Sequence, residues 1–171
     1  LKDYTGYFKV GLQLFTSCGF KPIEMIKEHG AKAFFDGKFH DIPNTVEKAS
    51  FNVVKNGATF FNVHSTGGIE MMKAARKGAD EAAQKYNLKK PLILAVSVLT
   101  SISDEILKNE LSNTKTSAEF VLQLAKNARM AGLDGVVASA KELKFIKNEM
   151  GKDFIVLTPG IRPKWSALDD Q

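Results

Sequence analysis

Three charged side chains lie close together in the stretch FFDGKFHDIPNT, residues 34 to 45, where Asp36, Lys38 and Asp41 follow an apolar run. On a β-strand, Asp36 and Lys38 point to the same face and Gly37 points to the opposite one. The two charged groups can therefore pair at the end of a strand. A lysine held in this way can stabilise a developing negative charge and deliver a proton, but a structural ion pair has the same pattern.

Asp36, Lys38 and Asp41 form a charged row. Asp41 and the residues near the row also allow structural interpretations. Asp41 stands just before a proline and a predicted helix, where an acid also serves as a cap or turn residue. His40 and His64 have no metal-ligand spacing such as HExxH, which favours structural roles. The STGG turn at 65 to 68 could cradle a phosphate, although such strand-to-helix turns are common.

Length and composition describe an ordinary soluble globular chain. The 171 residues are 44% hydrophobic and 25% charged, which predicts one domain over residues 1–171. Cys18 is the single cysteine, so no internal disulfide can form and a cytoplasmic location is favoured. No apolar run approaches the roughly 20 residues of a membrane helix, and the first residues lack a signal-peptide layout. We therefore expect no association with a membrane.

The net charge of +5 and pI of about 9.2 permit an anionic partner but do not identify one. The lysines are interleaved with acids and spaced as on exposed helix faces. A nucleic-acid platform would instead combine a dense basic stripe with aromatic residues. The sequence therefore predicts no nucleic-acid partner.

Short apolar runs rich in β-branched and aromatic residues alternate with longer segments of helical period. The predicted strands are residues 7–12, 32–38, 58–65, 91–99, 134–139 and 153–158. The predicted amphipathic helices are residues 21–30, 44–57, 67–86, 117–132 and 140–151. This alternation indicates a parallel sheet covered by helices, either doubly wound or closed into a barrel.

Polar residues at the strand ends favour the barrel. Every predicted strand carries or ends in at least one of them: Lys9, Asp36, Lys38, His64, Ser65, Ser97, Thr100, Ser139 and Thr158. A TIM barrel collects chemistry from the carboxyl ends of all its strands, whereas an open sheet concentrates its site near one switch point. The fold class predicted is therefore α/β, a TIM (β/α)8 barrel.

DGKFHDIPNT, with FKVG before it and TPGIRP after it, resembles orotidine 5′-phosphate decarboxylase of the bacterial type. NVHSTGG, VSVLTS and GLDGVVAS extend the resemblance along nearly the whole chain. The resemblance implies a homodimeric TIM barrel that uses no metal and no cofactor. It also implies conversion of a small-molecule nucleotide, orotidine 5′-monophosphate, to uridine 5′-monophosphate and carbon dioxide, the last step of de novo pyrimidine biosynthesis.

The resemblance also implies roles for the charged row. Lys38 is expected to be the catalytic lysine, which protonates C6 of the pyrimidine after carbon dioxide leaves. Lys9 is expected to position Asp36 and to contact the ribose. Asp41 is expected to reach across the dimer interface into the partner's site, and Thr45 to reach the ribose there. The active sites of the homodimer are thus expected to be shared.

Three further positions are expected to bind substrate: Thr100 at the pyrimidine, and Arg162 and Gln171 in and after the TPGIRP loop. The reaction passes through a carbanion at C6 that no adjacent carbonyl or cofactor delocalises. A preorganised ammonium group is therefore the physical requirement, and it contributes several kcal/mol in a dry site. Binding energy from the remote 5′-phosphate is expected to appear mainly in the transition state.

The sequence departs from the family pattern in two respects. An aliphatic residue more often occupies the position of Gly37, and we expect this change to affect helix packing more than chemistry. A complete family member also begins with a strand that ends in a ribose-binding aspartate, and finishes with a strand that carries a Gly-Arg phosphate site. The first and last strands are expected to be absent here, which predicts an incomplete barrel and poor or absent activity of this chain alone.

Two alternatives stay open at this point. A metal-dependent phosphosugar decarboxylase or synthase on the same barrel would share the Asp-x-Lys-x-x-Asp row and use magnesium, although DIPNT and TPGIRP argue against it. A catalytically silent barrel fragment could instead act as a binding module through its basic surface, and its binding would then weaken steeply with added salt.

Overall fold

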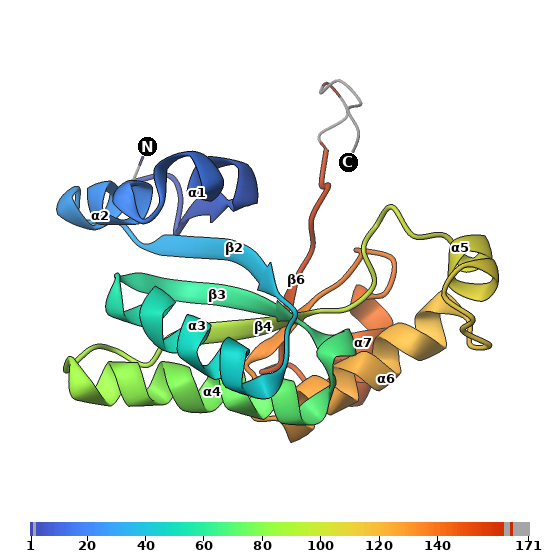
Figure 1. Cartoon of the computed structure of the whole chain (residues 1–171). Helices are drawn as coiled ribbons and strands as arrows, with labels where there is room; N and C mark the ends of the chain where they lie inside the picture. Colours follow the sequence, from blue (N-terminus) through green and yellow to red (C-terminus); the bar gives the residue numbers. More distant parts are fainter. Residues whose placement is uncertain (2, 163–164, 166–171) are drawn as a thin grey trace.

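The computed structural model describes residues 1, 3–162 and 165, and its centre is one parallel six-stranded sheet (Figure 1). Its strands are β1 (Phe8–Gly11), β2 (Ala33–Phe39), β3 (Ala58–His64), β4 (Leu92–Val96), β5 (Gly135–Val137) and β6 (Ile155–Leu157). They lie side by side in chain order, and every neighbouring pair is parallel. All six predicted strands are confirmed.

Helices connect consecutive strands. They are α1 (Leu12–Cys18), α2 (Lys21–Glu28), α3 (Pro43–Lys55), α4 (Gly68–Lys85), α5 (Asp104–Asn109), α6 (Ser117–Met130) and α7 (Leu143–Met150), with a 3-10 turn η1 (Ser65–Gly67) before α4. The five predicted helices are confirmed. The periodicity missed α1 and α5 because they have only 7 and 6 residues, too few to develop a periodic apolar face.

Parallel strands in sequential order, each followed by helical segments, are the arrangement of a TIM barrel. Figure 1 shows α3, α4 and α6 along one side of the sheet, as in the outer layer of such a barrel. Within the described residues, β1 and β6 are the two edges of the sheet. The fold is therefore a partial TIM barrel that is not closed.

The main hydrophobic core lies between the sheet and its helices. It includes Phe35, Phe61 and Ile93 from the strands and Met72 from α4, all at most 1% exposed. The Met pair of α4 thus faces the core as its helical spacing indicates. The α3 and α4 helices pack closely here. A Cβ on Gly78 would lie only 2.0 Å from the backbone oxygen of Glu47, so the contact leaves no room for a side chain at position 78.

A smaller apolar cluster covers the opposite face of the sheet, which would be the interior of the barrel. Phe34, Phe60 and Leu94 are its buried members. The rings of Phe34 and Phe60 stack with centroids 4.0 Å apart. Because aromatic side chains bury large areas, this cluster forms an apolar floor within the curve of the sheet.

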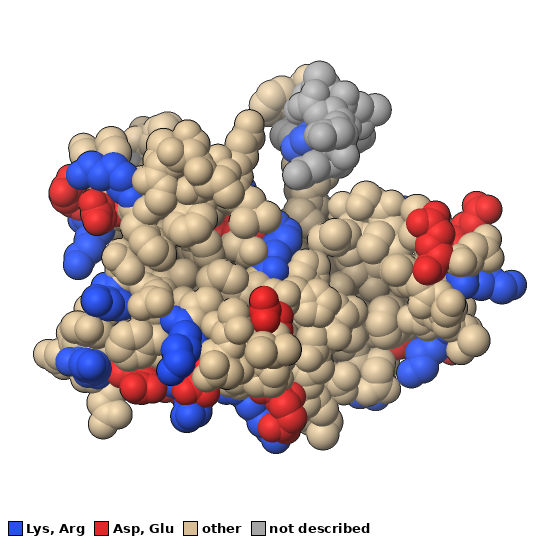
Figure 2. All heavy atoms as spheres, viewed as in Figure 1, with Lys and Arg blue, Asp and Glu red and all other residues tan. Residues whose placement is uncertain are grey.

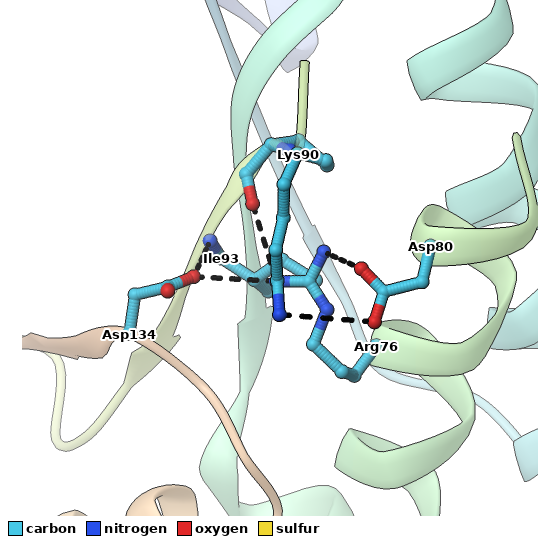
Figure 3. Close-up of polar contacts among 6 residues, drawn as sticks. Arg76, Asp80, Lys90, Ile93 and Asp134 are labelled. Carbon is cyan, nitrogen blue, oxygen red and sulfur yellow. Dashed lines mark hydrogen bonds and ion pairs between the residues drawn. The ribbon is translucent and has the colours of Figure 1, made fainter. Parts of the chain in front are cut away.

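A buried arginine ties α4 to the starts of two strands (Figure 3). Nη1 of Arg76 donates to the backbone oxygen of Pro91 at 3.1 Å and lies 3.3 Å from Oδ2 of Asp134. The same carboxylate accepts the backbone N–H of Ile93 at 2.7 Å, and Nη2 of Arg76 lies 2.7 Å from Asp80. This cluster lies at the amino ends of β4 and β5 and stabilises that end of the sheet.

None of the helices in the described part of the chain is long and apolar enough to cross a membrane.

Candidate active site

A cavity of about 340 Å³, here called the mouth cavity, lies over the carboxyl half of the sheet. All six strands contribute to its lining, either directly or through the residues that follow them. The lining residues are Lys9, Phe34, Asp36, Lys38, Asn62, Val96, Val98, Leu99, Thr100, Val137, Ala138, Leu157, Thr158 and Pro159. Residues from or just after all six strands thus line one cavity, as the strand ends of a TIM barrel do.

A larger hollow of about 520 Å³ lies beside β1 and α2, and its lining is mainly apolar. Size alone would favour it as a binding site. None of its described lining residues is a lysine or belongs to the charged row of β2. The mouth cavity is the better candidate for chemistry because it unites apolar walls with a convergent charged cluster.

Asp36 is the centre of that charged cluster. Nζ of Lys38 lies 2.6 Å from its Oδ1, and Nζ of Lys9 lies 3.4 Å from its Oδ2. Nδ2 of Asn62 donates to Oδ1 at 2.7 Å. Burial alone would raise the pKa of the Asp36 carboxyl, but hydrogen bonds from Lys38 and Asn62 and the charges of Lys38 and Lys9 outweigh it and lower the pKa. Asp36 is thus an ionised anchor for two ammonium groups.

The backbone of β2 is irregular at this point. From Phe35 to Phe39 the strand takes four residue steps, while β3 takes only two between their partners Phe61 and Val63. Within this bulge Lys38 has a φ of 48°, a left-handed conformation that is unfavourable for a residue with a Cβ. The predicted contact between Asp36 and Lys38 is present, but a bulge forms it rather than regular strand alternation. Bulges often redirect side chains beside active sites.

Gly37 faces away from the mouth cavity, as strand alternation indicates. A Cβ at this position would lie 2.1 Å from Cε1 of Phe35. The Phe35 ring is itself held edge-on by Phe15, at 4.9 Å between centroids. The ring of Phe35 therefore occupies the volume that an aliphatic side chain at position 37 would need.

His64 lies near the charged cluster, with its ring centroid 5.4 Å from that of His40. Burial, followed by the charges of His40 and Lys38, lowers the pKa of His64. His64 is therefore a neutral imidazole near pH 7. Among the residues that the structure describes, no three His, Cys, Asp or Glu side chains are grouped to hold a metal ion.

Asp41 and Thr45, predicted to serve a partner's site, lie outside the mouth cavity. Both are exposed, on the loop after β2 and in the first turn of α3. The Asp41 carboxylate accepts the backbone N–H of Ile42 at 2.7 Å. Its role as a turn acid is therefore present, and its accessible position also leaves it free to contact a second subunit.

The remaining predicted binding positions have different placements. Thr100, after β4, lines the mouth cavity. Arg162 is exposed and does not belong to the cavity lining. Gln171 lies outside the described residues.

Asn62 belongs to the site, although the sequence motifs did not identify it as a site residue. It is 1% exposed and lies on β3 between Phe61 and Val63. On a regular strand it shares a face with Phe60 and His64, which is the face of the mouth cavity. The available signal was a polar residue inside an apolar strand, because such a residue is buried only with hydrogen-bond partners.

The surface charge is mixed on the face that Figure 2 shows. Lys and Arg are scattered there, with Asp and Glu between them. This distribution agrees with the interpretation of the lysines as solvated helix faces.

Comparison with known proteins gives the family. The family model described as "Orotidine 5'-phosphate decarboxylase / HUMPS family" matches residues 1–171. A protein of Heliobacterium modesticaldum named orotidine 5′-phosphate decarboxylase is 45% identical over 169 residues, which cover 99% of this chain and 70% of the relative. A protein of the same name from Saccharophagus degradans is 50% identical over 163 residues, covering 95% of this chain and 66% of the relative.

Solved structures agree. The crystal structure of orotidine 5′-phosphate decarboxylase from Lactobacillus acidophilus superposes with a TM-score of 0.85 at 44% identity. That match covers 91% of this chain and 69% of the other. The predicted resemblance is thus confirmed, and the chain belongs to the orotidine 5′-phosphate decarboxylase / HUMPS family.

Proposed function

We propose that the chain decarboxylates orotidine 5′-monophosphate to uridine 5′-monophosphate, the last step of de novo pyrimidine biosynthesis. The observation that carries the proposal is the cluster of Lys38, Asp36 and Lys9 inside the mouth cavity, with Nζ of Lys38 2.6 Å from Asp36. The decarboxylase names of relatives at 42–50% identity support the same reaction.

In the proposed reaction, the bond between C6 of the pyrimidine and its carboxyl carbon breaks. Carbon dioxide leaves, and the electron pair stays on C6. The ammonium group of Lys38 faces this developing charge, and it is already held by Asp36, so little reorganisation is needed at the moment of reaction. Lys38 then gives one proton to C6, and solvent returns a proton to its amine. The chemistry requires a cation and a proton donor in one place, and Lys38 supplies both.

Asp36 serves two purposes in this mechanism. It orients Lys38 and Lys9 through contacts of 2.6 and 3.4 Å. Its negative charge also lies beside the site of the departing carboxylate, where it would destabilise the ground state. The first contribution rests on observed contacts and is the larger part of our proposal.

Substrate binding is assigned by the family motifs. Lys9 and Thr45 would contact the ribose, and Thr100 the pyrimidine. Arg162 and Gln171 would bind substrate from the segment after β6. Binding energy from the remote 5′-phosphate would be expressed mainly in the transition state.

We further propose a cytoplasmic homodimer of one TIM-barrel domain per chain, with Asp41 and Thr45 completing the partner's site. The exposure of both residues supports this arrangement. The single cysteine, Cys18, supports a reducing compartment.

A metal-dependent phosphosugar enzyme is the second candidate, because it would use the same Asp-x-Lys-x-x-Asp row. The names of the relatives favour the pyrimidine reaction. Following the absorbance of orotidine 5′-monophosphate with and without EDTA distinguishes the pyrimidine decarboxylase from the metal-dependent enzyme. Turnover that is slow, because the barrel is not closed, and that EDTA leaves unchanged is the expected result. Turnover lost in EDTA and restored by magnesium would favour the second candidate, and no turnover in either condition would contradict the proposed function.

A further inference from the structure

Asn62 makes two hydrogen bonds to the charged cluster. Its Oδ1 accepts the backbone N–H of Lys38 at 2.8 Å, and its Nδ2 donates to Oδ1 of Asp36 at 2.7 Å. A backbone N–H can only donate and an ionised carboxylate can only accept. The two contacts therefore fix the orientation of the amide, and an ionised carboxylate at this position could not make both.

The hydrogen bond to Lys38 acts where the backbone is strained. A φ of 48° is sterically unfavourable for a non-glycine residue, and such conformations persist only when surrounding contacts enforce them. The Lys38 N–H belongs to the β2 bulge, where the regular ladder with β3 is interrupted. The Asn62 amide accepts the Lys38 N–H in place of a backbone hydrogen bond between β2 and β3. It thereby holds the backbone position from which the Lys38 side chain extends.

We propose that Asn62 is a positioning residue, which clamps the left-handed backbone of Lys38 and the carboxylate of Asp36 so that the Lys38 ammonium group is held in one place. The inference deepens the proposed function and rests on it for its effect on turnover. Asn62 also lines the mouth cavity, but both of its observed bonds go to the charged cluster. Its contribution is therefore to the geometry of Lys38, and a misplacement of about 1 Å can cost on the order of 100-fold in rate.

Two variants separate positioning from simple stability. Asn62→Leu keeps a similar volume and removes both hydrogen bonds, and we expect kcat to fall about 10- to 100-fold with KM within about threefold of the original value. Arg76→Met is the matched control, because it disrupts a buried polar cluster at the opposite end of the strands. It is expected to lower stability while kcat of the folded protein is retained.

The pH dependence of kcat in Asn62→Asp is a second readout, and a merely structural role of Asn62 would not produce it. Its carboxylate would face that of Asp36 at hydrogen-bond distance, and two such groups share a proton as the pH falls. Protonated Asp at position 62 can donate to Asp36 as the amide does. The kcat of this variant relative to the unsubstituted chain should therefore rise about tenfold as the pH is lowered through the titration of the pair, whereas Asn62→Leu should show no such recovery.

The deciding experiment measures kcat and KM of the full chain and these three variants between pH 5 and pH 8, with amide hydrogen exchange of Lys38 recorded in parallel. A kcat for Asn62→Leu within about twofold of Arg76→Met, or no acid recovery in Asn62→Asp, would overturn the proposal.

If the unsubstituted chain itself has no turnover, the proposed function fails, and the exchange rate decides the inference. Exchange of the Lys38 N–H at least about tenfold faster in Asn62→Leu than in Arg76→Met would support the clamp. Equal exchange rates in these two variants would overturn it.

Discussion

The ammonium nitrogen of Lys38 lies 2.6 Å from Oδ1 of Asp36, although the two residues are separated only by Gly37 within a bulge of β2. A regular strand would point both side chains the same way without necessarily bringing their ends together. The bulge turns the Lys38 backbone into a left-handed conformation. A local backbone distortion thus creates the pair on which the proposed chemistry depends.

The strain at Lys38 predicts different stabilities for two inactive variants. Lys38→Ala and Lys38→Gly both remove the ammonium group, but only glycine adopts a φ of 48° without a steric cost. We expect Lys38→Gly to be the more stable variant by about 1 kcal/mol. Urea unfolding measures the difference, and an alanine variant equal to or more stable than the glycine variant would contradict the strain.

Gly37 and Phe35 are predicted to be energetically coupled. In Gly37→Ala the new methyl group would meet the Phe35 ring, which is 1% exposed, so we expect a loss of about 1–3 kcal/mol in stability from overpacking. Phe35→Leu alone should also destabilise the protein, but the double variant should lose less than the sum. A double-mutant cycle in urea gives the coupling, and strictly additive losses would contradict this packing.

Asp36 should make the protein sensitive to acid. Its folded pKa lies below the ordinary value of 3.8, so the unfolded state takes up the proton first as the pH falls. The stabilisation is therefore fully present above about pH 4 and is lost as the pH falls through the folded pKa. Asp36→Asn should have a smaller loss of stability below pH 4 than the unsubstituted chain. Equal slopes in urea unfolding between pH 4 and pH 2 would exclude this contribution.

A shared active site predicts recovery of activity on mixing two inactive variants. In a dimer of one Lys38→Ala subunit and one Asp41→Ala subunit, one site has both residues intact and the other lacks both. Random exchange of equal amounts should therefore restore about a quarter of the original activity. Turnover after exchange is the measurement, with Lys38→Ala mixed with itself as control. No recovery despite subunit exchange verified by mass labels would count against sharing.

The elements and the location of the site could be predicted from the sequence because they depend on period and order. The run PLILAVSVL is long and apolar enough to specify a buried strand. Polar residues such as Thr100 and Thr158 follow the strand ends, and parallel order brings those ends to one side. The helices α1 and α5 escaped prediction because neither is long enough for a periodic face.

The internal geometry of the site could not be predicted in the same way. Alternation along a strand assigns Lys38 to a face, but it does not reveal that the strand bulges between Phe35 and Phe39. Asn62 is distant in the sequence, and its two hydrogen bonds exist only once β2 and β3 are in register. Tertiary contacts of this kind have no local signal beyond the presence of a buried polar residue.

The most direct measurement for the central claim is the turnover of orotidine 5′-monophosphate by Lys38→Ala in EDTA, beside the unsubstituted chain and Arg76→Met. We predict slow turnover by the unsubstituted chain, whose barrel is not closed, and an equal rate by Arg76→Met after correction for the folded fraction. We predict a loss of at least about 1,000-fold in Lys38→Ala, because both the cation and the proton donor are removed. Turnover by folded Lys38→Ala within about tenfold of the unsubstituted chain would contradict the assignment of Lys38 as the catalytic residue.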